Sequence, residues 1–434
     1  MITTVKTDGQ AEYALLEQLE ARSGEVDRQV TAAVSEILET VRRDGDAAVA
    51  AYTKRFDGVD APVACVEREQ LGELAKACDP KIYAALERAA DNIADFHRRQ
   101  VQQSWMTTKE DGTILGQRIR GLARVGIYVP GGTAAYPSSV LMNAIPARIA
   151  GVKEIVMVTP PPKQGGFNAD VMAAAYIAGV DRVFLCGGAQ AIAALAYGTE
   201  SIPKVDKIVG PGNIYVATAK RLTYGMVDID MIAGPSEILI LADETADPAY
   251  LAADLMSQAE HDVLASAILL TDSERIAEET AAELARQIER LPRAEIVRRS
   301  LSDYGAMIVC RDMDEAVDFA NRLAPEHLEV MCDNPMEYIG RLDNAGSVFL
   351  GKYSPEPLGD YYAGPNHVLP TSGTARFFSP LSVDSFVKKS SFIYYNRPAL
   401  TAAREDIVTI ARAEGLDAHA NSIEVRFEET GKRD

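Results

Sequence analysis

Cysteine is scarce in this chain, and the spacing of its cysteines excludes the sites that cysteine usually builds. The five cysteines (Cys65, Cys78, Cys186, Cys310 and Cys332) are odd in number and widely spaced, and none belongs to a CxxC pair. Neither a disulfide framework nor a cysteine zinc site is therefore predicted. We expect reduced and mostly buried thiols.

Targeting segments, long apolar runs and an excess of basic residues are missing as well. The N-terminal stretch has no basic region followed by an apolar one and no Arg- and Ser-rich bias, so neither a signal peptide nor a transit peptide is predicted. No apolar run reaches the roughly 18 residues of a transmembrane helix. The 44 Lys and Arg against 63 Asp and Glu give a formal charge of −19, which argues against nucleic acid or an anionic membrane as a partner. We predict a cytoplasmic protein.

The length and the hydrophobic pattern predict several α/β domains. A chain of 434 residues with 47% hydrophobic residues can bury a large core and exceeds one ordinary domain. Residues 26–105 show helical spacing of apolar residues and many charges, and we expect His97 there on the helix surface. From residue 124, short β-rich runs alternate with helices, and the rhythm resumes after residue 236. This alternation is typical of parallel, doubly wound sheets.

We therefore predict an α/β fold with two doubly wound, incomplete Rossmann-like βα domains. A helical N-terminal insertion and a small C-terminal domain complete the prediction. No sequence repeat relates the two α/β domains, although their shared rhythm permits a duplication. The predicted boundaries are 26–105 for the helical insertion, 124–235 for the first α/β domain, 1–25 with 106–123 and 236–380 for the second, and 381–434 for the C-terminal domain.

Glycines stand at the ends of three predicted strands in the first α/β region. They are PGG at 130–132, CGGAQ at 186–190 and GPGN at 210–213. Such turns expose backbone N–H groups at a helix N-terminus, where phosphate binds well. None matches GxGxxG, and a glycine can equally serve to shape a tight turn. Three such turns at successive strand ends favour a nucleotide or phosphate site.

Histidine is also rare, and its placement suggests a metal site. Four of the five histidines, His261, His327, His367 and His419, lie in the second half of the chain. Gln258 and His261 are three residues apart in a helical segment, so they share one face. Histidine with oxygen donors suits zinc or another divalent first-row ion. The spacing alone is a weak signal for metal.

Two further places carry groups suited to catalysis. Glu326 and His327 are adjacent at a predicted helix-to-strand junction, APEHLEV, and would serve two roles in proton transfer. Alternatively, Glu326 caps the helix end and His327 merely opens a strand. Asp360 and His367 lie in the Gly- and Pro-rich stretch 351–380, and such long irregular stretches are often functional. His367 fits a simple turn equally well.

Seven motifs, in order and from about residue 120 to 425, resemble the histidinol dehydrogenase family. They are GIYVPGG, GPGN, AGPSE, SQAEHD, APEHLE, GDYYAGPNHVLPT and EGLDAHANS. The agreement of seven separate motifs makes the resemblance specific. The helical region 26–105 contributes length but no diagnostic motif.

The resemblance implies a role for each matching position. It implies a zinc ion held by Gln258, His261, Asp360 and His419. It implies an acid–base pair, Glu326 and His327, and NAD contacts at Tyr128, Gln190 and Asn213. It implies substrate contacts at Ser236, Gln258, His261, His327, Asp360, Glu414 and His419.

The resemblance also implies a reaction and an assembly. The family oxidises L-histidinol through L-histidinal to L-histidine with two NAD, the last step of histidine biosynthesis. His327 would take the alcohol proton, and Glu326 would activate water for the second oxidation. Family members are homodimers of four-domain subunits, so Glu414 and His419 would complete the partner's site.

Three alternatives stay open at the level of sequence. A paralogue on the same scaffold would oxidise another polar alcohol, and Glu414 and His419 argue against it. A zinc hydrolase would have no use for the glycine-bearing turns of a dinucleotide site. A non-catalytic metal-binding module would leave Glu326 and His327 without a purpose. An assay of NAD reduction with L-histidinol and an NAD titration separate these readings.

Overall fold

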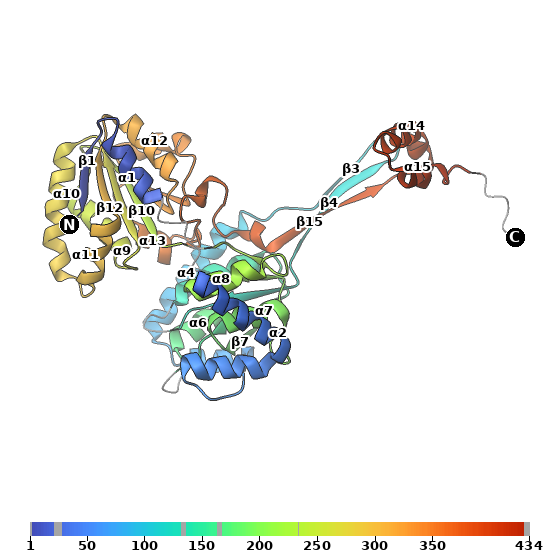
Figure 1. The fold of residues 1–434 in the computed structure, drawn as a ribbon, viewed down its shortest axis with the longest axis horizontal. Coiled ribbons are helices and arrows are strands. Elements are labelled where there is room, and N and C mark those ends of the chain that lie inside the picture. The colour runs from blue at the N-terminus through green and yellow to red at the C-terminus, as the bar shows by residue number, and fades with distance from the viewer. Residues whose placement is uncertain (1, 21–27, 132–135, 163–166, 233, 429–434) are drawn as a thin grey trace. The chain divides into compact units, whose positions relative to one another are not determined.

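The computed structural model describes residues 2–20, 28–131, 136–162, 167–232 and 234–428. The chain divides into two compact units (Figure 1). The main unit comprises Met1–Val101 and Gly121–Phe386, and the small unit comprises Gln102–Arg120 and Val387–Asp434. Within the described ranges, no helix combines the length and the apolar character needed to cross a membrane.

The first sheet of the main unit runs in the order β2-β7-β6-β5-β8-β9. Its neighbouring strands are parallel, except that β2 is antiparallel to β7. Alternate residues of its central strands point into two separate cores, with Val125 and Ile127 on one face and Val156 and Val158 on the other. Because both faces are covered, these strands read as continuous apolar runs. The strands are β2 (Cys65–Glu67), β5 (Arg124–Tyr128), β6 (Glu154–Thr159), β7 (Arg182–Leu185), β8 (Lys207–Val209) and β9 (Asp228–Ile229).

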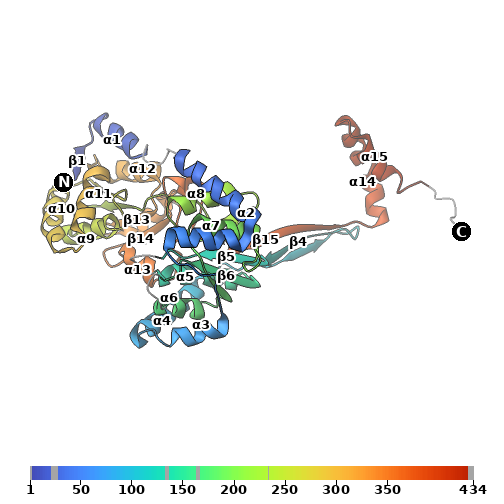
Figure 2. The same ribbon diagram turned by 60° about the horizontal axis from the view of Figure 1, so that its bottom comes forward.

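Helices cover both faces of this sheet (Figure 2). One layer contains α2 (Arg28–Asp57), α7 (Gly188–Tyr197) and α8 (Ile214–Thr223), and the other contains α3 (Arg68–Ala75), α4 (Pro80–Arg98), α5 (Pro137–Ile149) and α6 (Ala169–Ile177). The predicted helical insertion over 26–105 is therefore not a separate domain. Its amphipathic helices bury their apolar faces on the first α/β layer, and its strand β2 extends the sheet.

The second sheet is entirely parallel and runs in the order β1-β12-β11-β10-β13-β14. Helices α9, α10 and α11 pack on one face, and α1 and α12 on the other (Figure 1). The predicted α/β fold is confirmed. The strands are β1 (Thr3–Lys6), β10 (Glu237–Ala242), β11 (Ser266–Thr271), β12 (Gly305–Val309), β13 (His327–Met331) and β14 (Ser347–Leu350). The helices are α1 (Ala11–Glu20), α9 (Pro248–Ala259), α10 (Glu274–Gln287), α11 (Ala294–Tyr304), α12 (Met313–Leu323) and the short α13 (Glu356–Tyr361).

The two sheets share one topology. When β5 to β9 and β10 to β14 are each numbered in chain order, both sheets read 3-2-1-4-5. The winding direction therefore reverses between β5 and β8 in the first sheet and between β10 and β13 in the second. Ligands of doubly wound sheets bind where the winding reverses, outside the carboxyl ends of the strands. The shared rhythm in the sequence thus corresponds to a shared strand order.

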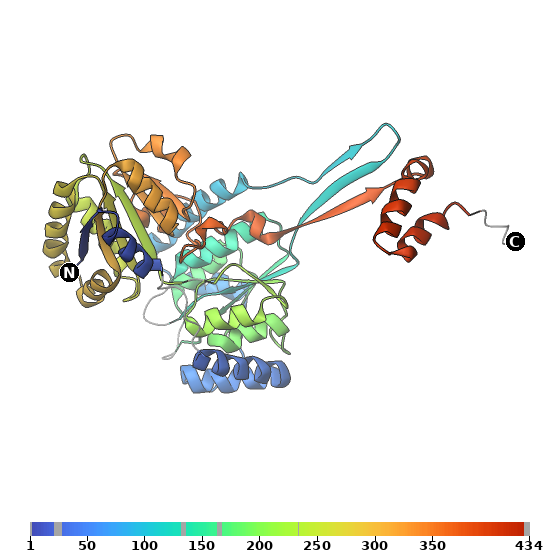
Figure 3. The same ribbon diagram turned by 45° about the horizontal axis from the view of Figure 1, so that its top comes forward.

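The small unit is built from segments far apart in the sequence (Figure 3). Strands β3 (Trp105–Thr108), β4 (Ile114–Gly121) and β15 (Val387–Tyr394) form a sheet in the order β15-β4-β3. Helices α14 (Arg397–Ala413) and α15 (Asp417–Glu424) pack on each other through Val408, Ala411 and Ala420. The predicted assignment of 106–123 to the second α/β domain is wrong, because the β3–β4 hairpin pairs with β15. A partner strand so distant in sequence leaves no local signal.

Two predictions about side chains had different outcomes. The five cysteines are free and, apart from the half-buried Cys65, buried, as predicted. The predicted surface position of His97 is wrong, because its side chain is fully buried. Its Nδ1 lies 2.8 Å from the carbonyl oxygen of Ile93, and its Nε2 lies 3.4 Å from the amide nitrogen of Asn366. The two charged residues that follow it, Arg98 and Arg99, favoured the prediction of an exposed position.

Candidate active site

The predicted acid–base pair lies at the amino ends of strands in the second sheet. His327 opens β13 and pairs in register with Ile238 near the start of β10. These are the two strands between which the winding reverses. The pair thus occupies the edge opposite to the carboxyl ends, where doubly wound sheets usually bind ligands. Helix α13 brings Glu356 and Asp360 to the same place.

His327 is buried and held in one tautomer. Its Nδ1 lies 3.0 Å from the carbonyl oxygen of Glu237, which only accepts, so Nδ1 carries the proton. Its Nε2 lies 4.0 Å from a carboxylate oxygen of Glu356 and 4.0 Å from one of Asp360. Among the described residues, Nε2 has no hydrogen-bond partner. Burial lowers the pKa of His327 to about 4, against the opposing charge of Asp360, so the free imidazole is neutral at pH 7.

Glu326 is anchored to the same residue. The backbone N–H of Glu237 donates to the Glu326 carboxylate at 3.0 Å, and that oxygen lies 3.7 Å from Nδ1 of His327. Burial raises the pKa of Glu326 well above its ordinary value, although the N–H of Glu237 works against this. One backbone unit therefore fixes both members of the pair, and burial favours the protonated form of the Glu326 carboxyl.

Glu356 is a site residue that the sequence reading missed. His327, Glu356 and Asp360 each offer a ligand atom, and these atoms lie within 4.8 Å of one another. Burial, and then the charge of Asp360, raise the pKa of Glu356 to about 9. Its backbone N–H donates to Glu329 at 2.7 Å. Glu356 and Asp360 are four residues apart, a spacing that places two side chains on one face of a helix. The many glycines and prolines around them did not suggest a helix, so this spacing was not used to predict a site.

Gln258 and His261 lie at the end of α9, beside Glu356. The hydroxyl of Ser257 in that turn donates to the Glu356 carboxylate at 3.2 Å. Gln258 is fully buried, and neither polar atom of its side chain has a partner among the described residues. His261 follows the helix end, exposed, and lies near enough that its charge disfavours protonation of His327. The Gln258–His261 pair therefore borders the cluster around His327.

His367 and its loop connect Asp360 to the first α/β layer. The Nδ1 of His367 lies 3.0 Å from the carbonyl oxygen of Asp360 and 3.7 Å from its carboxylate. On the other side, its Nε2 lies 3.5 Å from the hydroxyl of Ser139 in α5. The side-chain amide of Asn366 also donates to the backbone of Met142 in α5, at 2.7 Å. His367 thus does more than fill a turn, since it contacts Asp360 of α13 and Ser139 of α5.

The three positions tied to a dinucleotide lie at the carboxyl edge of the first sheet. Tyr128 ends β5, and its hydroxyl accepts a hydrogen bond from the N–H of Gly188 at 3.1 Å. Gln190 lies in the first turn of α7, buried, and its amide has no partner among the described residues. Asn213 caps α8 by accepting from the N–H groups of Tyr215 and Val216. These turns surround the reversal between β5 and β8; Gly132 of the PGG turn lies outside the described residues.

Comparison with known proteins decides the family. The family model described as histidinol dehydrogenase matches residues 20–427. The chain belongs to the histidinol dehydrogenase family. It is 57% identical over 401 residues to the histidinol dehydrogenase of Listeria monocytogenes, covering 92% of this chain and 94% of the relative. It is 59% identical over 396 residues to that of Geobacillus kaustophilus, covering 91% and 93%.

A solved structure agrees over the whole chain. The crystal structure of histidinol dehydrogenase from Elizabethkingia anophelis is 37% identical, covers 98% of both chains and superposes with a TM-score of 0.92. The resemblance drawn from the seven motifs is thus confirmed, and membership of the histidinol dehydrogenase family makes the protein an enzyme, an oxidoreductase. The roles of individual residues stay predictions.

Three predicted positions remain, namely Ser236, which is adjacent to Glu237, and Glu414 and His419 in the small unit. Ser236 directly precedes β10, and its carbonyl oxygen accepts from the N–H of Ser266. Glu414 ends α14 and His419 lies in α15, both exposed and both in the small unit. Their predicted roles, and that of Ser236, therefore stay predictions.

The residues of the main-unit cluster fit a divalent cation. Buried polar atoms without partners are rare because burial without a hydrogen bond costs about 1–3 kcal/mol each. Gln258, His327 and Glu356 are among the described residues that carry such atoms, and the ligand atoms of His327 and Glu356 lie within 4.8 Å of one another and of Asp360. Amide, imidazole and carboxylate donors together suit zinc, which takes nitrogen and oxygen ligands.

Proposed function

We propose that the protein is a zinc- and NAD-dependent dehydrogenase that oxidises L-histidinol to L-histidine through L-histidinal, the last step of histidine biosynthesis. Its relatives are named histidinol dehydrogenase, which supports L-histidinol as the substrate. The observation that carries the proposal is the set of buried, unpartnered donors beside Glu326 and His327. These donors and the acid–base pair occupy one end of the second sheet, and α5 of the first sheet borders them.

Gln258, His261 and Asp360 would hold the zinc ion, with His419 as the fourth ligand. Bound zinc would supply a positive charge that holds the amine and imidazole nitrogens of the substrate. Ser236 and Glu414 would make further contacts with the substrate. The chain's own contribution is rigidity, because Gln258 is locked in the last turn of α9 and Asp360 in the short helix α13.

His327 and Glu326 would move the protons. His327 is neutral at pH 7, and its protonated Nδ1 is fixed on Glu237, so Nε2 is free to accept the proton of the alcohol. Glu326, whose carboxyl has a raised pKa, would take a proton from water and so prepare the hydrated aldehyde for the second oxidation. Keeping the aldehyde bound in a closed site prevents loss of a reactive compound.

Tyr128, Gln190 and Asn213 would bind NAD at the reversal between β5 and β8. When bound, NAD would accept a hydride from the substrate carbon in each of two oxidations. The N-termini of α7 and α8 face this edge, and the positive ends of their helix dipoles would favour a pyrophosphate there. The unpartnered amide of Gln190 is one further buried donor and acceptor for the cofactor.

We also propose that the enzyme works as a cytoplasmic homodimer in which Glu414 and His419 serve the partner's site. The support is the position of both residues outside the main unit, exposed on α14 and α15. A site that draws ligands from two copies is incomplete in a monomer.

A substrate panel tests the proposal. The zinc-loaded protein is assayed for NAD reduction with L-histidinol, with other amino alcohols and after treatment with a chelator. We expect L-histidinol to be preferred and the chelated protein to be inactive until zinc is restored. Equal or faster oxidation of another polar alcohol would favour a paralogue. Absence of NAD binding by titration would revive a zinc hydrolase.

A further inference from the structure

A buried ion pair lies beneath the GPGN turn of the first sheet. The side chains of Lys220 in α8 and Asp230 after β9 are only 4% and 2% exposed, and they pair directly. The Lys220 ammonium also donates to the carbonyl oxygen of Gly210 at 3.0 Å. The Asp230 carboxylate accepts from the N–H of Gly210 at 2.8 Å and from that of Met231 at 2.7 Å. The ion pair therefore holds both backbone polar groups of one glycine.

Gly210 stands where the winding of the first sheet reverses. It directly follows β8 with a φ of +112°, and an added Cβ would lie 2.1 Å from the carbonyl oxygen of Tyr128. The turn thus presses on the end of β5 and leads within three residues to Asn213, the N-cap of α8. Two of the three positions proposed to contact NAD, Tyr128 and Asn213, flank the glycine that the ion pair fixes.

The energetics indicate a positioning role. Desolvation of two charges offsets much of their attraction, so a buried pair is often no more stabilising than apolar residues of similar volume. What this pair provides is geometry. It connects α8, the end of β9 and the turn after β8, and it supplies partners to backbone groups that lie too deep for water.

We propose that Lys220 and Asp230 are positioning residues for the dinucleotide, because they fix the Gly210–Asn213 turn and the start of α8 against the end of β5. Neither side chain touches the cofactor in this account. The inference rests on the proposed use of NAD and deepens it, by naming what holds the binding turn in place. Loosening the Gly210–Asn213 turn should weaken binding of NAD. Binding of L-histidinol, which is proposed to lie beside Glu326 and His327 at the second sheet, should be unaffected.

Three variants and one matched control test the proposal in the full-length, zinc-loaded protein. Lys220→Met removes the ammonium, Asp230→Ala removes both acceptor oxygens, and Asp230→Asn keeps an oxygen for the N–H of Gly210. The control is Lys207→Met, because Lys207 is also buried, 8% exposed, and pairs with Asp228 and the carbonyl oxygen of Ser385. Neither of these two contacts involves the Gly210–Asn213 turn.

We expect the Kd and KM for NAD to rise about tenfold or more in Lys220→Met and Asp230→Ala, and less in Asp230→Asn. The Kd for L-histidinol should stay within about twofold of wild type in all of them, and Lys207→Met should bind NAD normally.

If folded variants lose thermal stability but bind NAD as wild type does, the ion pair is merely structural and the proposal is wrong. If Lys220→Met does not fold, the comparison of Asp230→Ala with Asp230→Asn tests the proposal. A wild-type protein that binds no NAD would instead refute the proposed function itself.

Discussion

Glu237 holds both members of the proposed catalytic pair through its backbone groups. Its N–H donates to Glu326, and its carbonyl oxygen accepts from His327. Because β10 and β13 are paired in register, this arrangement is part of the sheet and not of a loop. The side chains proposed to move protons are thus held by backbone groups of the sheet.

Glu356 offers a test at the scale of a single residue. Its carboxylate lies beside His327 and Asp360, accepts from Ser257, and completes the group of close ligand atoms. We expect Glu356→Ala to weaken zinc binding about 10- to 100-fold, which is the usual cost of removing a group that supports metal ligands. Competition with a fluorescent chelator measures this affinity. Glu278→Ala, an exposed glutamate on α10, is the control and should bind zinc as wild type does. Equal zinc affinities in the two variants would exclude Glu356 from the site.

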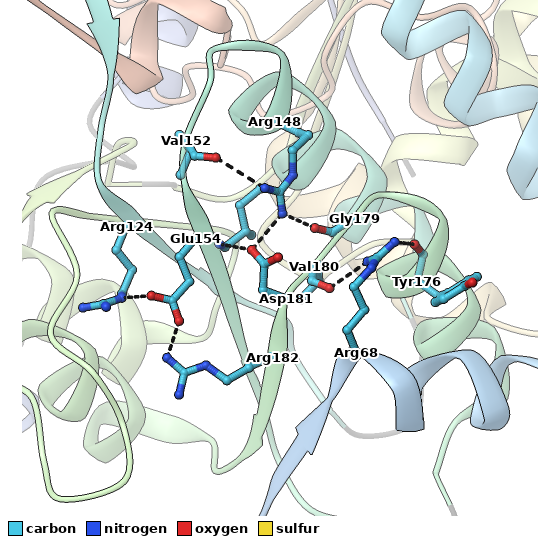
Figure 4. Close-up of polar contacts among 11 residues, drawn as sticks. Arg68, Arg124, Arg148, Val152, Glu154, Tyr176, Gly179, Val180, Asp181 and Arg182 are labelled. Atoms are coloured by element: carbon cyan, nitrogen blue, oxygen red, sulfur yellow. Dashed lines mark hydrogen bonds and ion pairs between the residues drawn. The ribbon is translucent and has the colours of Figure 1, made fainter.

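At the scale of elements, charged side chains tie together the strand ends of the first sheet (Figure 4). Glu154 in β6 forms ion pairs with Arg124 in β5 and Arg182 in β7. Next to it, Arg148 at the end of α5 pairs with Asp181 at 2.7 Å. These contacts lie at the amino edge of the sheet, away from the turns proposed to bind NAD, so they are suited to a test of stability without an effect on the cofactor.

The Glu154 cluster should make stability depend on pH. Burial works to raise the pKa of Glu154, but the hydrogen bonds from Arg124 and Arg182 outweigh it and leave the pKa below its ordinary 4.5. A depressed folded-state pKa stabilises above the unfolded value, and this stabilisation is lost as pH falls through the folded value. We expect Glu154→Gln to cost about 1 kcal/mol of unfolding free energy at pH 7, given partial exposure, and the difference from wild type to shrink below pH ~4.5.

Urea denaturation of both proteins between pH 7 and pH 3 measures this difference, with Glu278→Gln as the matched exposed variant. A gap that stays constant down to pH 3 would show that the ion pairs contribute nothing through the charge of Glu154.

The sequence predicted some elements well because their signals are local. The apolar strands and the helices between them carry their own periodicity, so the α/β fold followed from pattern alone. The elements against which a helix packs or with which a strand pairs could not be predicted, because those partners are distant in sequence. The helices of 26–105 gave no sign that they cover the first sheet, and the hairpin at β3–β4 gave no sign of its pairing with β15. The predicted position of His97 is wrong for the same reason, since Asn366, which contacts its buried ring, lies far along the chain.

The residues of the candidate site likewise fall into those predicted from local motifs and those brought together only by folding. Gln258 and His261, and the adjacent Glu326 and His327, were visible as short motifs. Glu356 was not, because only the folded chain sets it against His327. No sequence pattern predicts the ion pair of Lys220 and Asp230, because the spacing of a lysine and an aspartate ten residues apart does not indicate that either is buried.

At the scale of the whole molecule, the position of Glu414 and His419 in the small unit predicts complementation between inactive subunits. A Glu326→Gln subunit lacks the main-unit carboxyl, and a His419→Ala subunit lacks the ligand that we propose it gives to its partner. In a mixed dimer, one site carries both lesions and the other carries neither. Co-refolding equal amounts should therefore restore up to about a quarter of wild-type activity, as random pairing gives half mixed dimers.

The control for complementation is a mixture of Glu326→Gln with His327→Ala, both in the main unit. Every site of that mixture keeps one lesion, so no activity should return. Activity that fails to return in the first mixture, although dimers form, would place His419 in the site of its own chain or outside any site.

The central claim is a four-electron oxidation that uses NAD twice at one zinc site. Its most direct test is the stoichiometry of NADH formed from a limiting, weighed amount of L-histidinol by the zinc-loaded protein, followed by absorbance to completion. We expect two NADH for each L-histidinol, with L-histidine as the product. One NADH for each L-histidinol, with L-histidinal accumulating, would contradict it.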